Sequence, residues 1–171
     1  MALLVSLLLT IVLVFIDQLT KYYAVLYLKG QEPIVLWQQV LELHYHENDG
    51  IAFSMFAGWQ WLIVPITALV MLLIFVIMWR STMRNHWLFR TSCILILAGG
   101  IGNLIDRTVL GYVVDFIYVR LIDFPIFNVA DCCVVIGAAL LIVYVLFVYK
   151  EEDDLPLRTV LFGIGKREKQ L

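Results

Sequence analysis

The sequence has little charge and little cysteine, and it lacks the short motifs of the common hydrolases. Only 15% of its 171 residues are charged, whereas 63% are hydrophobic. Soluble globular chains are about a quarter charged and about half apolar. This composition therefore indicates a membrane protein, and the length indicates a single domain. A net charge of −2 provides no basic footprint, so no nucleic-acid partner is expected.

Cysteine is too sparse for a disulfide framework. Cys93 and the adjacent pair Cys132 and Cys133 lie in apolar runs without CxxC or zinc spacing, so we expect small packing residues. His44 and His46 alternate along one predicted strand and could share a metal ion, but no third ligand is evident, which favours surface histidines. The absence of P-loop, GxSxG and HExxH motifs disfavours a serine-triad or zinc protease.

Long apolar runs are what the sequence has in abundance. Four of them approach the roughly 20 residues of a membrane-spanning helix, at about residues 3–28, 59–79, 88–107 and 128–149. The first lacks a basic start and a small-residue cleavage site, so we expect a retained helix rather than a cleaved signal peptide. Arg80, Arg84 and Arg90 surround the second connection, which the positive-inside rule places in the cytoplasm. Both termini are then expected to be cytoplasmic.

Two polar connections would share the opposite, outer face. The first contains Ile34–Leu36 and Leu41–His46, which have strand character, followed by the turn sequence Asn48-Asp49-Gly50. We therefore expect a short hairpin or curved sheet there. The tail at 151–171 carries charges of both signs and is expected to be cytoplasmic and partly disordered.

The unusual polar residues gather at one level of this predicted topology. Charge within hydrocarbon is costly and is usually retained for function. Five segments converging on one depth therefore predict a single polar site facing the bundle interior. The residues are Asp17, Lys21, Asn48, Gly50, Asn103, Asp106, Arg107, Asp115, Asn128 and Asp131.

Asp115 and Asp131 are the candidate catalytic pair. Two close carboxylates can share one proton, so that one activates water and the other protonates a leaving amine. Asn128 is predicted to cap a helix with Asp131 in its first turn, where the helix dipole favours negative charge. We therefore expect Asp131 to be more often ionised and Asp115 more often protonated.

Structural interpretations remain open at this point. Asp131 could be only a helix-start carboxylate, and Asp115 an acid at the water surface. Asp17 and Lys21 could be an interfacial pair with a snorkelling lysine, and Asp106 and Arg107 a pair at the membrane boundary. The same buried acids would also suit a small proton-coupled transporter, but that class favours polar residues through the membrane or paired broken helices. A non-enzymatic scaffold would not require so many clustered polar groups.

Over about residues 12–150 the chain resembles the bacterial lipoprotein signal peptidases, the type II signal peptidases. The resemblance depends on five motifs in order, Asp17-Gln-Leu-Thr-Lys21, Asn48-Asp-Gly-Ile-Ala-Phe53, Gly102-Asn-Leu-Ile-Asp-Arg107, Val113-Val-Asp-Phe116 and Phe127-Asn-Val-Ala-Asp131. Each motif is weak alone, but their combination on four apolar runs is specific.

The resemblance implies an aspartic endopeptidase of the bacterial cytoplasmic membrane, with Asp115 and Asp131 as its dyad and an active site at the extracytoplasmic face. Its substrates would be prolipoproteins, cleaved just before a cysteine that carries a diacylglyceryl group. The resemblance also implies two kinds of partner, membrane lipid and globomycin-type peptide inhibitors. It implies no cofactor and no metal. The other polar residues named above would shape the site or bind within it. The implied architecture is a domain over 1–150 with four transmembrane helices, an extracytoplasmic β cradle at about 29–58 and a lid segment at about 108–127.

Overall fold

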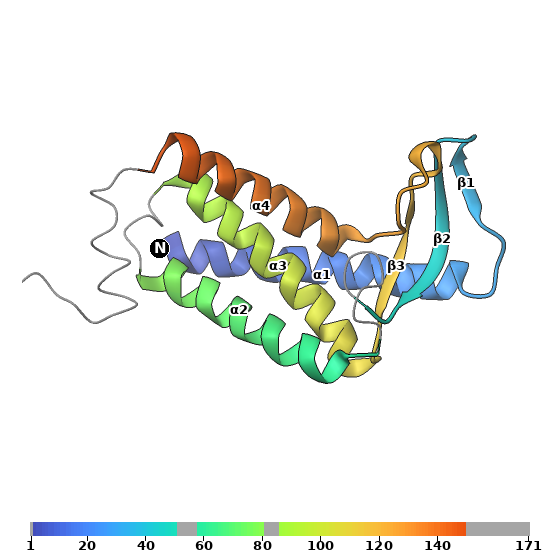
Figure 1. Ribbon diagram of the computed structural model, residues 1–171, viewed down its shortest axis with the longest axis horizontal. Helices are drawn as coiled ribbons and strands as arrows, with labels where there is room; N and C mark the ends of the chain where they lie inside the picture. The colour runs from blue at the N-terminus through green and yellow to red at the C-terminus, as the bar shows by residue number, and fades with distance from the viewer. Residues whose placement is uncertain (1, 51–57, 81–85, 150–171) are drawn as a thin grey trace, which may run out of the picture.

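The computed structural model describes residues 2–50, 58–80 and 86–149. These residues form four long helices and one small sheet (Figure 1). The helices are α1 (Ala2–Leu28), α2 (Gln60–Arg80), α3 (Trp87–Val109) and α4 (Val129–Phe147), and the strands are β1 (Ile34–Trp37), β2 (Leu41–Asn48) and β3 (Val113–Tyr118). All four helices are long and apolar enough to cross a membrane. The predicted class, an α-helical membrane protein with four spans and a small sheet, is confirmed.

Helix α3 packs against all three other helices. Its small residues explain this central place, because a glycine lets a neighbouring backbone come close. A Cβ atom added at Gly99 would overlap the carbonyl oxygen of Ala130 on α4. On the facing side, a Cβ atom at Gly137 of α4 would lie 2.9 Å from Leu95 Cβ of α3. Helices α3 and α4 therefore pack with their backbones in near contact.

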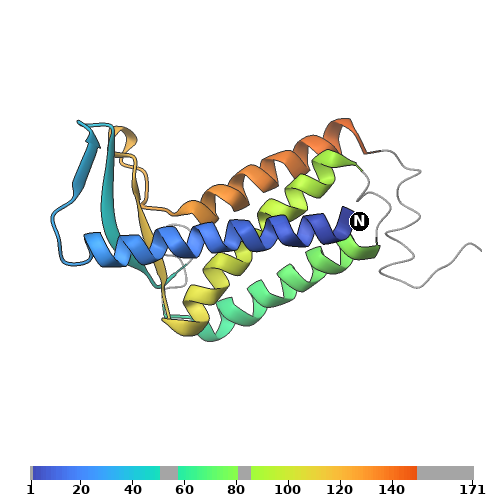
Figure 2. The same cartoon turned by 180° about the vertical axis from the view of Figure 1, so that it is seen from behind.

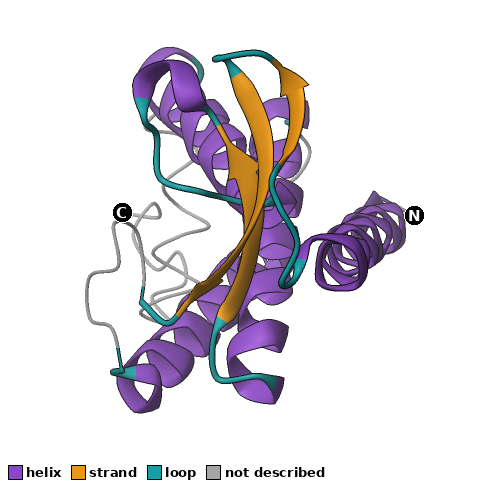
Figure 3. Cartoon of the chain, turned by 90° about the vertical axis from the view of Figure 1, so that its right-hand side faces the viewer, coloured by secondary structure: helices purple, strands orange, loops and turns teal. Residues whose placement is uncertain are grey.

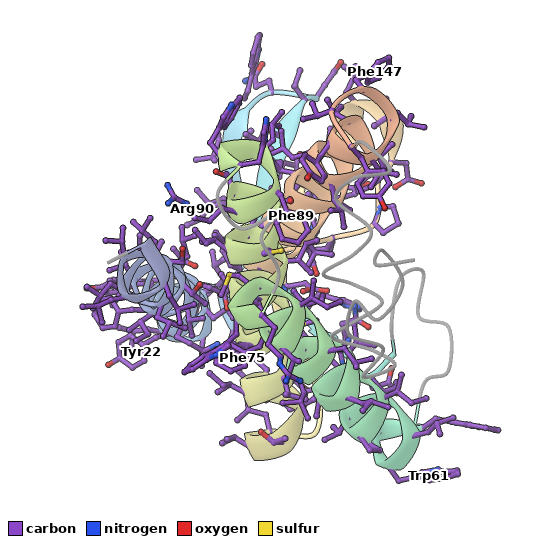
Figure 4. The ribbon with its side chains drawn as sticks, turned by 90° about the vertical axis from the view of Figure 1, so that its left-hand side faces the viewer. Tyr22, Trp61, Phe75, Phe89, Arg90 and Phe147 are labelled. Atoms are coloured by element: carbon purple, nitrogen blue, oxygen red, sulfur yellow. The ribbon has the colours of Figure 1, made fainter. Side chains whose placement is uncertain are left out.

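Apolar side chains on the other helix faces point outward. Tyr22, Trp61 and Phe147 lie at the periphery of the bundle, whereas Phe89 lies between α3 and α4 (Figure 4), with its ring 5.4 Å from that of Tyr144. An exposed surface of this kind is unfavourable in water and favourable in lipid. It fits a chain that crosses the membrane several times.

The sheet lies at one end of the bundle, opposite the N-terminus (Figures 1 and 2). Its order is β1-β2-β3 with antiparallel pairing throughout. The hairpin predicted over the first connection is confirmed, with Ile34 opposite Leu43. The third strand is a finding of the structure, because it occupies part of the segment at 108–127 that the resemblance implies to be a lid.

One face of β3 is buried on the last turns of α1. Val114 and Phe116 form a small core with Ala24 and Leu28, and this apolar contact joins the sheet to the bundle. The strand crosses the end of the helices (Figure 3). A carboxylate placed on β3 is therefore held by both the sheet ladder and the bundle.

A buried carboxylate fastens the connection after β3 to β2. Glu42 accepts hydrogen bonds from Arg120, in the short 3₁₀ helix η3 (Arg120–Ile122), and from His44, whose Nε2 lies 2.8 Å away. The Arg120 guanidinium, and then the His44 contact, hold the pKa of Glu42 below its usual range. His44 is thus bound to Glu42 in this contact. His46 is exposed and lies opposite Asp115 in the strand register.

Candidate active site

The two candidate aspartates are brought together by a chain reversal between β3 and α4. Ile117 and Phe127 exchange backbone hydrogen bonds of 2.8 and 3.0 Å. The chain therefore returns along β3 before α4 begins, and α4 starts beside the strand that carries Asp115. The side chain of Asp115 is almost fully buried, and Asp131 in the first turn of α4 is partly buried.

Asn128 joins the two carboxyl groups. Its Oδ1 accepts the backbone N–H of Asp131 at 2.9 Å, and Asp131 Oδ2 accepts the backbone N–H of Asn128 at 3.1 Å. This reciprocal capping box confirms the predicted N-cap. Because the amide oxygen caps the helix, its NH₂ group faces the other way and donates to Asp115 Oδ1 at 2.6 Å. One amide thus contacts both aspartates.

Asn48 supplies a second donor to Asp115. Its Oδ1 accepts the backbone N–H of Gly50 at 3.0 Å, so its NH₂ group faces Asp115 Oδ2 and donates at 2.9 Å. The predicted turn at Asn48–Gly50 therefore fixes the orientation of the amide. Gly50 itself is buried, and its carbonyl accepts from Arg107 Nη2 at 2.7 Å.

Asn103 supplies the corresponding donor to Asp131. Its Oδ1 accepts from Lys21 Nζ at 2.9 Å and from Asn128 Nδ2 at 3.2 Å, and its NH₂ group donates to Asp131 Oδ1 at 2.8 Å. Each of the four carboxylate oxygens of Asp115 and Asp131 therefore accepts one hydrogen bond. These hydrogen bonds orient both carboxyl groups. Among the described residues, neither group forms an ion pair.

Burial raises the pKa of Asp115 to about 6. The negative charge of Asp131 raises it further, while the hydrogen bonds from Asn48 and Asn128 act in the opposite direction. A carboxyl group in this environment retains its proton to higher pH than an exposed aspartate. This direction agrees with the expectation that Asp115 is the more often protonated member of the pair.

Behind the pair lies a buried ionic cluster. Lys21 Nζ is 2.9 Å from Asp17 Oδ2 and 3.0 Å from Asp106 Oδ2, and all three side chains are at most 4% exposed. The alternative of an interfacial pair with a snorkelling lysine is therefore wrong. The pairing of Asp106 with Arg107 at the boundary is also wrong, because Asp106 faces Lys21 while Arg107 faces Gly50.

Gln18 also belongs to this cluster, although it is not among the predicted site residues. Its Nε2 lies 2.9 Å from Asp106 Oδ1 and 3.2 Å from both Asp17 Oδ2 and the Gly102 carbonyl oxygen. A neutral amide within an apolar helix, next to Asp17, was the available signal. All ten predicted site residues are described, and hydrogen bonds and ion pairs join them into one network that includes the ionic cluster and the two aspartates. Ile51–Phe53, Arg84 and the tail at 151–171 lie outside the described residues.

Comparison with known proteins identifies the family. The family model for signal peptidase (SPase) II matches residues 9–147. A lipoprotein signal peptidase of Lactococcus lactis subsp. cremoris (strain MG1363) is 36% identical over 84% of this chain and 94% of its own length. One from Streptococcus pyogenes serotype M5 (strain Manfredo) is 38% identical over 84% of this chain and 91% of its own.

Two solved structures of bacterial membrane enzymes have the same fold. One, at 2.3 Å resolution, has a TM-score of 0.75 and 27% identity over 98% of this chain and 94% of that one. The other, at 1.9 Å resolution, has a TM-score of 0.75 and 31% identity over 85% and 94% of the two chains. These matches are to peptidases and membrane enzymes, so the transporter alternative has no support. The chain belongs to the signal peptidase II family and is a multi-pass membrane protease.

Proposed function

We propose that this protein removes signal peptides from prolipoproteins by aspartic catalysis, with Asp115 and Asp131 as its two catalytic residues. The observation that carries the assignment is the double contact of Asn128, which caps the helix of Asp131 and donates to Asp115. Two carboxyl groups joined through one oriented amide suit a water molecule activated between them.

The chemical step follows from the different surroundings of the two groups. Asp131 accepts a proton from water as the water oxygen attacks the scissile carbonyl carbon. Asp115 supplies its proton to the substrate, and the amine nitrogen is protonated as its bond to the carbonyl carbon breaks. The products are a carboxylic acid and an amine, and the proton on Asp131 returns to Asp115 before the next cycle. This assignment follows from the burial of Asp115, which raises its pKa to about 6, and from the place of the partly exposed Asp131 in the first turn of α4.

The substrate would be a prolipoprotein cleaved just before its diacylglyceryl-modified cysteine. A site at the end of the bundle allows the lipid to stay in the bilayer while the peptide reaches water. Asn48, Asn103, Arg107 and Asn128 would position the peptide, with Gly50 at the turn beside them. Arg107 Nε is buried and has no hydrogen-bond partner in the described part of the chain, so this donor would gain a partner if a substrate carbonyl reached it.

The site would face the outside of the cytoplasmic membrane, with both termini in the cytoplasm. Arg80 at the end of α2 and Arg90 at the start of α3 lie at the end of the bundle away from the sheet (Figure 1). Basic residues favour the cytoplasmic side. Reporter fusions to the C-terminus, active only inside or only outside the cell, test this orientation.

The direct test uses the full chain in liposomes with a diacylglyceryl-modified prolipoprotein. Asp115→Asn and Asp131→Asn should each lower the cleavage rate by at least about 10²-fold, the scale of a lost general acid or base. Asp123→Asn is the matched control, since this exposed acid after β3 should leave cleavage unchanged. Cleavage at the normal rate by either dyad variant would refute the assignment. A globomycin-type peptide should block the wild-type reaction.

A further inference from the structure

The two buried carboxylates behind the dyad each hold the backbone next to a proposed catalytic residue. Asp17 Oδ1 accepts the backbone N–H of Ala130 at 2.9 Å, and Ala130 directly precedes Asp131. Asp106 Oδ2 accepts the backbone N–H of Val114 at 3.1 Å, and Val114 directly precedes Asp115. The first bond joins α1 to α4, 113 residues apart in the sequence, whereas the second joins the consecutive elements α3 and β3. Helix α1 thus holds the start of α4, and helix α3 holds β3.

Lys21 connects these two supports. Its ammonium group contacts Asp17 and Asp106 at 2.9 and 3.0 Å, and it donates to Asn103 Oδ1 at 2.9 Å. An ammonium group has three N–H donors, and these three acceptors use all of them. Lys21 therefore has no donor left for a substrate. Its charge acts directly on Asp115, whose pKa it lowers, and its contacts act through its three partners.

We propose that Asp17, Lys21 and Asp106 form a positioning triad that sets the separation and orientation of Asp115 and Asp131. The inference rests on the proposed function and deepens it. Asp17 fixes the backbone before one aspartate, Asp106 fixes the backbone before the other, and Lys21 fixes the distance between these supports. Through Asn103, Lys21 also orients the amide that donates to Asp131. None of the three is a catalytic residue, because none contacts the reacting atoms.

The triad adds a second link between the elements that carry the two aspartates. Asn128 and the backbone pair of Ile117 with Phe127 join β3 to the start of α4 on one side, and the triad joins them on the side of α1 and α3. A displacement of about 1 Å at a reacting group can reduce a rate about 10²-fold. Removing one partner of a buried ion pair is costly, and here both carboxylates share Lys21 and accept hydrogen bonds from Gln18 and from a backbone N–H group.

The test uses Asp17→Asn and Asp106→Asn in the full-length enzyme. Each variant keeps an oxygen for the backbone N–H but removes the charge that faces Lys21. We expect kcat to fall about 10²-fold with KM little changed, because positioning acts on the transition state. In ¹⁵N-labelled enzyme, Asp17→Asn should shift the amide signal of Val114 as well as that of Ala130, because Lys21 links the two supports.

A milder variant and two controls make the outcome decisive. Gln18→Ala removes a donor to both carboxylates without leaving an unpaired charge. It should lower kcat about tenfold. This variant tests the triad if the two Asn variants do not fold. Lys29→Met removes the lysine of an exposed pair with Glu47 and should change nothing.

Folded variants with wild-type kcat, or with a loss confined to KM, would overturn the triad, as would a Val114 signal that does not respond to Asp17→Asn. Asp115→Asn in the same series separates the two proposals. If it stays active, the catalytic assignment of Asp115 in the proposed function fails. If it is inactive while the folded triad variants are unaffected, only the triad fails.

Discussion

Asn128 Nδ2 lies 2.6 Å from Asp115 Oδ1, although the two residues belong to different elements of the fold. The same side chain caps α4 through its oxygen. Its orientation is therefore determined by helix formation, and the donor that faces Asp115 is in place before any substrate arrives. Asn128 therefore has two roles, the helix cap and the hydrogen bond to Asp115, and substitutions that remove one or both can distinguish them.

Asn128→Ala and Asn128→Ser should differ in stability but agree in activity. Alanine removes the cap, which is worth about 1 kcal/mol. Serine retains an oxygen for the Asp131 N–H but has no amide to reach Asp115, so it should recover most of the stability. Both should lose about 10²-fold in kcat, the effect of removing one oriented donor. Thermal unfolding in detergent and cleavage assays measure the two quantities. A serine variant with full activity would contradict this role.

The value of kcat/KM should fall as the pH rises through about 6. It reports the ionisation of the free enzyme, and the pKa of Asp115 is raised to about 6, chiefly by burial. The proton that Asp115 supplies is lost above that pH. Asn48→Ala removes a hydrogen bond that lowers this pKa, so its alkaline limb should lie at higher pH. An alkaline limb that Asn48→Ala does not move would contradict the assignment of this proton to Asp115.

Asp115→Asn should become more stable relative to the wild type as the pH rises. The folded protein keeps the Asp115 proton up to about pH 6, whereas the unfolded chain releases it near 3.8. Wild-type stability from this group is therefore present below about pH 4 and lost as the pH rises through 6, a change of about 3 kcal/mol. Thermal unfolding across this range measures the difference. The exposed, uncharged substitution Leu121→Ala should show no such trend.

Gly99→Ala should be far more damaging than Gly100→Ala. A Cβ atom at position 99 would overlap the backbone carbonyl oxygen of Ala130, which cannot move without displacing α4. At position 100 the overlap is with the end of the flexible Met71 side chain, which can change rotamer. Overpacking against backbone costs about 1–3 kcal/mol. Unfolding temperatures measured side by side test this, and equal losses would contradict it.

The membrane class, the four spans and the hairpin could be predicted because each follows from local composition. Apolar runs of membrane length, alternation at Leu41–His46 and the turn at Asn48–Gly50 need no distant partner. The cap at Asn128 is also local, because it joins residues three positions apart. The common depth of the polar residues could be predicted from the order and orientation of the four spans.

Tertiary structure decided which groups meet within that level. The pairing of β3 with β2 was not predicted, because it joins Asp115 to a strand about 70 residues earlier. Lys21 is buried rather than placed at the membrane–water boundary because Asp106 and Asn103, on helix α3, contact its ammonium group. The contacts of Asp17 with Ala130 and of Asp106 with Val114 involve backbone N–H groups, which every residue except proline carries and no pattern marks. The sequence thus determined the spans and the kinds of polar group, while packing across α1, α3, α4 and the sheet determined their partners.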